Sequence, residues 1–398
     1  MHFGMRSVMF DKAPLVRVAV SLILGIIIAN YLPLPIPMLP VLIAILIIAL
    51  LLWKYENLQS LAILLCFLIM GMFLMQRQLS MPDEPQTVSS LDRSKAYFMH
   101  QRSKLLERFS DNGVDGDAYA VVAAMSLGEK SALTRTLKDT YSVSGASHVL
   151  ALSGLHLGII YMLLSLFLPR RRWPALSQSI IILMIWAFVF LVGMSVSVVR
   201  SAVMLTLYGL LSIGHRDKMS VNALCFTAIV MLMWNPVWLF DVGFQMSFMA
   251  VLAILMFVPL FEDVFSAKYL MEHRWVKWTW GMVTVSCSAQ LGVAPLIAFY
   301  FGRFSAYFLL TNFIVVPAAM LIIWLSIVVL VFPSLAYILL NIVNTLNTVL
   351  LSIKALPGSS IEGLHPNVLQ VVLIYILIFC TYLLIERIKP VMGWRASR

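Results

Sequence analysis

The sequence predicts an all-α, polytopic integral membrane protein, a helical bundle with about 10–12 transmembrane helices at ~20 residues per span. Of its 398 residues, 61% are hydrophobic and only 12% are charged, and the mean hydropathy is +0.94. Soluble proteins carry roughly 25% charged residues. The composition therefore excludes a soluble enzyme, a disordered chain and a disulfide scaffold.

Twelve apolar segments, each bounded by proline, glycine or charge, are the predicted spans. In chain order they are 15–32, 38–53, 58–75, 148–168, 177–194, 197–213, 221–234, 244–260, 280–301, 307–332, 335–353 and 368–385. The second and the seventh are short for a complete crossing. An even number of spans places both termini on one side of the membrane.

The distribution of charge predicts which side that is. The net charge of +10 comes from 28 basic and 18 acidic residues, and most of the excess lies in the loops on the side of the termini, as in the run of arginines at 170–172. Cytoplasmic loops are enriched in Lys and Arg, so we expect both termini in the cytoplasm. The positive charge is then a feature of topology and not a sign of nucleic-acid binding.

One long polar stretch, 76–147, is predicted on the outer side. It contains a linker at 80–90, an amphipathic helix at 96–109 that is able to lie in the membrane interface, and helical pieces at 117–127 and 133–141. The predicted division of the chain is 1–76, N-terminal transmembrane helices; 77–117, extracytoplasmic linker and amphipathic helix; 118–332, transmembrane core; and 333–398, C-terminal transmembrane helices and cytoplasmic tail.

Polar side chains inside apolar segments are costly in lipid and therefore mark candidate functional positions. The segment GASHVLALSGLHLG, 145–158, brings His148, Ser153, Gly154 and His156 together. On an unbroken helix the two histidines are two turns and about 12 Å apart, too far to share one metal. Either each histidine hydrogen-bonds a neighbouring helix, or both face a polar passage or a broken-helix site. The clustered serine and glycine favour the second reading.

Two further segments carry charge. Arg200 lies in GMSVSVVRSAVM, 193–204, where it either snorkels to the outer surface or faces an internal path. Asp241 and Gln245 lie four residues apart in NPVWLFDVGFQMSF, 235–248, and share a helix face. Asp241 is a candidate partner for Arg200, because both are predicted near the outer side.

Two amides each precede a proline by five residues. Gln290 lies in AQLGVAP before Pro295, and Asn312 lies in TNFIVVP before Pro317. Hydrogen bonding between helices explains either amide alone. Together the two segments resemble the broken helices that line membrane passages.

These five segments, in this order, resemble the competence-domain motifs of the ComEC family, bacterial inner-membrane proteins associated with DNA uptake in natural transformation. The resemblance implies a multi-pass inner-membrane channel through which single-stranded DNA enters the cytoplasm. The residues it implies along the DNA path are His148, Ser153, Gly154, His156, Arg200, Asp241, Gln245, Gln290 and Asn312. The implied partners are single-stranded DNA, the lipid bilayer, and separate DNA-receptor, helicase and nuclease proteins.

The chain departs from the family pattern in two ways. Many members carry an OB-like domain, for which 76–117 is too short, and a C-terminal metallo-β-lactamase-like domain, for which no H-x-H-x-D-H run is present. We expect strand-degrading activity to come from another polypeptide. No Gly-rich phosphate loop is present and the four cysteines are widely separated, so the sequence predicts no catalytic residue, no cofactor, no metal and an external driving force.

Two other functions remain open from the residues alone. A small-molecule or ion transporter would use His148, His156, Arg200 and Asp241 as relay groups. An intramembrane hydrolase would use Ser153 as nucleophile with one of the histidines as base. No orienting carboxylate lies near Ser153 in the sequence, which weakens the hydrolase reading.

Overall fold

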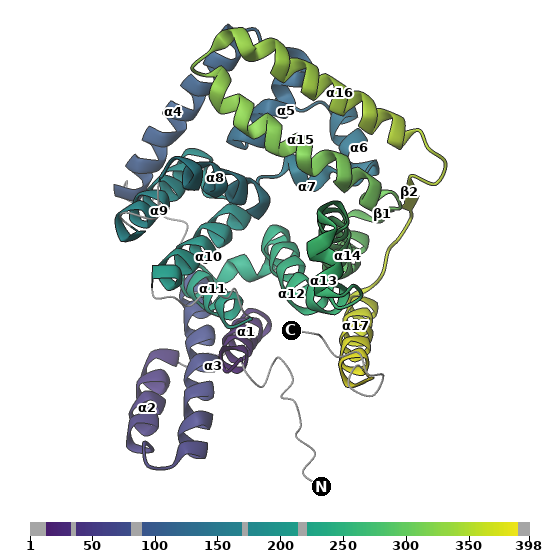
Figure 1. The fold of residues 1–398 in the computed structure, drawn as a ribbon. Helices are drawn as coiled ribbons and strands as arrows, with labels where there is room; N and C mark the ends of the chain where they lie inside the picture. The colour runs from purple at the N-terminus through teal and green to yellow at the C-terminus, as the bar shows by residue number, and fades with distance from the viewer. Residues whose placement is uncertain (1–12, 33–36, 81–89, 169–173, 214–220, 389–398) are drawn as a thin grey trace. The chain divides into compact units, whose positions relative to one another are not determined.

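The apolar runs fold into α-helices in a computed structural model that describes residues 13–32, 37–80, 90–168, 174–213 and 221–388 (Figure 1). Seven helical stretches among these residues are long and apolar enough to cross a membrane: Glu56–Ser80, Pro174–Leu191, Val242–Glu262, Arg274–Phe301, Phe308–Val329, Pro333–Lys354 and Val368–Ile388. Their outer faces are apolar, with Leu183 70% and Leu377 66% exposed, as expected of surfaces that lipid covers. The chain is therefore an all-α, multi-pass membrane protein, which confirms the predicted fold class.

Backbone contacts divide the chain into two units. Unit 1 consists of 1–89 and 203–245, and unit 2 consists of 90–202 and 246–398. The divisions fall within α10 (Val196–Ile213) and near the start of α12 (Val242–Glu262), so each of these helices contributes to both units. The four stretches predicted from the sequence stay a prediction. The predicted linker lies almost entirely outside the described residues, as do the arginines at 170–172 and both termini.

Unit 1 contains α1 (Leu15–Tyr31), α2 (Met38–Leu51), α3 (Glu56–Ser80), α11 (Val221–Trp234) and the short 3₁₀ helix η1 (Pro236–Phe240). Helices α1 and α3 touch through glycine: a Cβ on Gly25 would overlap the Leu68 carbonyl oxygen, and one on Gly71 would overlap that of Leu22. Small residues permit such close backbone approach in membranes. The Leu15 amide donates to Asn222 Oδ1 (3.3 Å) and joins the start of α1 to α11.

Unit 2 contains most of the helices. They are α4 (Ser90–Asp111), α5 (Gly116–Leu127), α6 (Arg135–Val143), α7 (Ser147–Leu150), α8 (Gly154–Phe167), α9 (Pro174–Leu191), the parts of α10 and α12 named above, α13 (Ala267–Glu272), α14 (Arg274–Phe301), α15 (Phe308–Val329), η2 (Pro333–Leu335), α16 (Ala336–Lys354) and α17 (Val368–Ile388).

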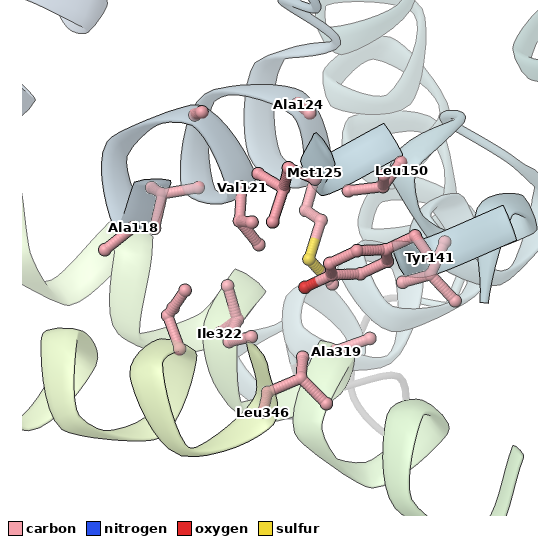
Figure 2. Close-up of a cluster of buried hydrophobic side chains, with 14 of the residues drawn as sticks. Ala118, Val121, Ala124, Met125, Tyr141, Leu150, Ala319, Ile322 and Leu346 are labelled. Atoms are coloured by element: carbon pink, nitrogen blue, oxygen red, sulfur yellow. The ribbon is translucent and has the colours of Figure 1, made fainter. Parts of the chain in front are cut away.

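The core of unit 2 forms where α5 packs against α15 and α16 (Figure 2). Met125 and Tyr141 project toward Ala319 and Leu346 there. The Tyr141 hydroxyl donates to Asn347 Oδ1 (2.8 Å), which satisfies a buried polar group. The sequence places α5 in a polar outer stretch, but the structure buries most of it because its alanines and valines fit closely between the two long helices.

The predicted amphipathic helix is present as α4, and part of its apolar face packs on protein. Phe98 stacks on Phe190 of α9 with ring centroids 5.6 Å apart, and Phe109 is buried in the core. Arg102 donates to Glu129 at 2.8 Å. The backbone N–H of Ser131 and the Arg102 guanidinium hold the pKa of Glu129 below its usual range. Protein therefore covers part of this face, while Tyr97 remains 60% exposed, and the expected interface role stays a prediction.

A two-stranded antiparallel sheet, β1 (Arg303–Ser305) with β2 (Ser360–Glu362), was not expected from the sequence. Close to β1, Asp139 on α6 accepts hydrogen bonds from Lys354 Nζ (2.7 Å) and Arg303 Nη1 (3.2 Å). These bonds lower the pKa of Asp139, the Lys354 bond most of all. One carboxylate therefore ties α6 to β1 and to the end of α16.

Candidate functional site

The segment with the two histidines is a broken helix. Helix α7 ends at Leu150 and α8 begins at Gly154, and between them Ala151 (φ −93°, ψ 126°) and Ser153 (φ −135°, ψ 178°) are extended. Gly145, at φ 86°, turns the chain before α7 in the left-handed region that glycine favours. The sequence reading of a broken-helix site is thus supported in its geometry, and α8 begins at the break with Ser153 as its N-cap.

Ser153 and His156 close that end. The Ser153 backbone N–H donates to His156 Nδ1 (3.3 Å), and Ser153 Oγ lies 3.2 Å from the same nitrogen. This is a capping box with histidine in the place usually taken by Glu or Gln. His156 is completely buried and its Nε2 has no hydrogen-bond partner, whereas His148 is exposed with Nδ1 3.1 Å from the Gly145 carbonyl oxygen. The two rings therefore have different surroundings.

Arg200, on the first half of α10, points into the protein. It is only 6% exposed, so it does not snorkel to a surface. Nη1 donates to the Ser247 carbonyl on α12 (2.6 Å), and Nη2 donates to Ser201 Oγ (3.0 Å). The guanidinium carbon is 6.0 Å from the centroid of the Phe248 ring, within range of a cation–π contact.

Gly154 brings the histidine segment and the arginine segment together. A Cβ atom on Gly154 would lie 2.8 Å from Ser201 Oγ and 2.9 Å from Arg200 Nη2. The guanidinium therefore rests directly on the first turn of α8, in space that a side chain at position 154 would take. We call this meeting of α8, α10 and α12, defined by Ser153, Gly154, His156, Arg200 and the Ser247 carbonyl, the arginine junction.

Asp241 and Gln245 have local structural partners. Asp241 Oδ1 accepts from the Phe244 backbone N–H (2.8 Å) at the start of α12, an N-cap contact. Gln245 Nε2 donates to the Leu239 carbonyl of η1 (3.0 Å). Both residues belong to unit 1 and Arg200 belongs to unit 2, so the pairing of Asp241 with Arg200 stays a prediction.

The two amides that precede prolines lie in unbroken helices. Gln290 is half-buried on α14 and Asn312 is half-buried on α15, and both helices continue through their prolines, Pro295 and Pro317. The expectation of broken helices at these two segments is wrong. Asn312 Oδ1 is nevertheless buried without a hydrogen-bond partner, so this amide remains a polar atom in an apolar setting.

Sequence reasoning missed the acceptor role of Ser247 and the steric role of Gly154. Every residue has a backbone carbonyl, so the residue type at position 247 could not predict this contact. Gly154 did carry a sequence signal. It is the first residue of α8, it follows a serine that can cap that helix, and it precedes a histidine. Within the described residues no group of three or more His, Cys, Asp or Glu is placed to hold a metal ion.

The chain is similar to known proteins over its central and C-terminal parts. The profile of a family described as "Competence protein" matches residues 125–388. The chain is 29% identical over 215 residues to ComE operon protein 3 of Bacillus subtilis, covering 52% of the chain and 26% of that protein. It is 33% identical over 198 residues to an uncharacterized protein of Aquifex aeolicus, covering 50% and 44%. It is 25% identical over 241 residues to recombination protein 2 of Haemophilus influenzae, covering 58% and 29%.

The chain thus spans less than half the length of each of these relatives. No solved structure matches it. The family profile covers well over half of the chain and includes all nine candidate residues, from His148 to Asn312. The chain therefore belongs to the competence protein family, the ComEC family whose motifs its sequence resembles.

Proposed function

We propose that this protein passes single-stranded DNA across the bacterial inner membrane into the cytoplasm during natural transformation. The family and the names of similar proteins, among them competence protein ComA of Neisseria gonorrhoeae, support a role in DNA uptake. The multi-pass helical fold supports a role within the membrane. On this proposal the protein is a conduit and not an enzyme, and both termini face the cytoplasm.

The observation that carries the proposal is the arginine junction. Three of the five motif segments meet there around a charged guanidinium that is removed from solvent. Charged side chains inside membrane proteins are expensive and mark ion or substrate pathways. Arginine contacts nucleic-acid phosphate without reading sequence, as a path for DNA of any sequence requires.

The partners proposed are the DNA strand, the lipid bilayer, and separate receptor, helicase and nuclease proteins. A receptor is needed because the outer loops have little excess positive charge with which to capture DNA. A helicase or similar protein would supply the driving force, and a nuclease would degrade the strand that stays outside.

Gene deletion in a transformable host tests this function. We expect transformation to fall to background, while binding of labelled DNA to the cell surface persists and uptake into the cytoplasm stops. A plasmid copy of the gene should restore transformation and uptake to the levels of the parent strain and leave surface binding unchanged. Unchanged transformation in the deletion strain would overturn the proposal.

Ser153 and His156 favour a second candidate function, an intramembrane hydrolase, because Oγ and Nδ1 are 3.2 Å apart. A serine nucleophile and a histidine base need this distance. The same Nδ1 also accepts the Ser153 backbone N–H, which suits a helix cap. Complementing the deletion with Ser153→Ala or Ser153→Thr separates the two: a hydrolase loses its activity with either variant, whereas a cap tolerates threonine.

A further inference from the structure

Two positive groups face each other at the arginine junction. The N-terminal end of an α-helix carries about half a positive charge, because its first backbone amides have no acceptor within the helix. Helix α8 begins at Gly154, and Arg200 Nη2 would be only 2.9 Å from a Cβ placed there. A full positive charge thus lies against a partial one, an arrangement that an anion would stabilise.

Among the described residues of unit 2, no acidic side chain contacts Arg200. In the described part of unit 2, the side-chain contacts of Arg200 are the neutral oxygens of Ser247 and Ser201 and the ring of Phe248. Its Nε is buried without a hydrogen-bond partner, and so is Nε2 of His156 one turn into α8. Buried charges are ordinarily paired, so this one is set up to receive an external partner.

We propose that the arginine junction binds one phosphodiester group of the strand at the first turn of α8, where the Arg200 guanidinium moves away from Gly154 to make room for it. This inference rests on the proposed DNA passage. Hydrogen bonds from a guanidinium to a charged phosphate oxygen are stronger than those to a neutral carbonyl, so the phosphate replaces Ser247 as acceptor. Helix N-termini are suited to phosphate.

A single phosphate site fits a conduit better than a row of tight sites does. Conduction requires binding that is favourable enough for entry and weak enough for release. The Ser247 carbonyl occupies Nη1 when no phosphate is bound and competes with each phosphate that arrives. Each phosphate of a moving strand is therefore held briefly and then released when the carbonyl returns.

Salt-dependent binding of a fluorescent oligothymidylate to the full chain in maltoside detergent tests this site. We expect Arg200→Gln to weaken binding at least about tenfold and to reduce the slope of log K against log salt by about 0.7, the value for one phosphate contact on a single strand. Arg200→Lys should weaken binding but keep the slope, since lysine retains the charge and loses the planar fork. Lys268→Gln, which removes an exposed cation on α13, is the matched control.

Two further arms identify the anion. An oligomer with uncharged methylphosphonate linkages should bind the parent and Arg200→Gln equally. Phosphatidylglycerol added to the micelles should not displace the oligothymidylate from the parent; displacement that Arg200→Gln abolishes would assign the site to lipid phosphate and overturn the proposal for DNA. Thermal unfolding of both variants establishes whether they are folded. If Arg200→Gln is not folded, the test relies on Arg200→Lys, which retains the buried cation.

An unchanged salt slope in folded Arg200→Gln overturns the inference. Failure of the phosphate site can be distinguished from failure of the proposed function. If the deletion strain loses transformation while an Arg200→Gln strain transforms as the parent does, DNA passage stands and the phosphate site does not. If the deletion strain transforms normally, the function itself fails.

Discussion

Helix α8 contains two glycines with different surroundings, Gly154 and Gly158. At Gly154 the space for a side chain is taken by Ser201 and Arg200, whereas a Cβ added to Gly158 would meet nothing within 4 Å. The two glycines are one turn apart on the same helix, so they separate the effect of packing from that of helix propensity. Arg200 lies in space that a side chain at position 154 would take.

We predict that Gly154→Ala destabilises the protein and that Gly158→Ala does not. Filling an occupied site typically costs about 1–3 kcal/mol, while alanine in an open helical position is favoured over glycine by about 1 kcal/mol. Thermal unfolding in detergent should show a lower midpoint for Gly154→Ala than for the parent and an equal or higher one for Gly158→Ala. Equal midpoints for the two variants would contradict the close contact seen at Gly154.

At the scale of elements, the helices follow from the sequence and several of their contacts do not. Each predicted apolar segment overlaps an observed helix, because runs of apolar residues between breakers leave few alternatives in lipid. Pro295 and Pro317 predicted breaks, but a proline within a membrane helix is tolerated when neighbouring groups satisfy the freed carbonyl. Strands β1 and β2 have three residues each, too few to show alternation.

For the candidate site, as for the helices, the sequence predicted the segments but not how they contact one another. The costly polar residues identified the segments, and the break before α8 followed from the serine and glycine there. The meeting of Gly154 with Arg200 did not follow, because it depends on how helices distant in sequence pack. Asp241 and Gln245 were singled out for their polarity, yet each makes a local hydrogen bond, to Phe244 and to Leu239 respectively.

The link between α6, β1 and α16 gives an element-scale prediction about pH. The pKa of Asp139 is lowered by Lys354 and then by Arg303, so the carboxylate stabilises the fold above its ordinary pKa of 3.8 and loses that effect as the pH falls below it. Asp139→Asn should therefore be less stable than the parent at pH 7, and the difference should shrink toward pH 3. Since the side chain is 47% exposed, we expect a difference below about 1 kcal/mol at pH 7.

Thermal unfolding in detergent at the two pH values measures this difference. Glu107→Gln on α4 supplies the baseline for removal of one exposed carboxylate outside the cluster. A difference between Asp139→Asn and the parent that stays constant from pH 7 to pH 3 would show that the charge of Asp139 does not stabilise this link.

At the scale of the whole molecule, the distribution of charge predicts the orientation of the chain in the membrane. Arg17 lies at the start of α1 and Lys54 follows the end of α2, two positions on the same side if both helices cross the membrane. Arg387 lies in the last turn of α17. Basic residues beside spans are retained in the cytoplasm. On the predicted topology the excess positive charge orients the chain, whereas the charge that we propose to contact DNA is a single buried arginine.

This distribution predicts the sidedness of two points in the chain. A fluorescent protein fused after Arg398 should fluoresce in the cytoplasm, and alkaline phosphatase fused at the same point should be inactive, because the C-terminus is expected inside. Alkaline phosphatase inserted at Gly113, in the turn between α4 and α5, should be active, because that stretch is expected outside. Activities measured in whole cells and normalised to the amount of fusion protein test both points. The reverse pattern would place the N-terminal end of α8 and the phosphate site on the wrong side for an entering strand. The proposed DNA path therefore depends on the predicted orientation.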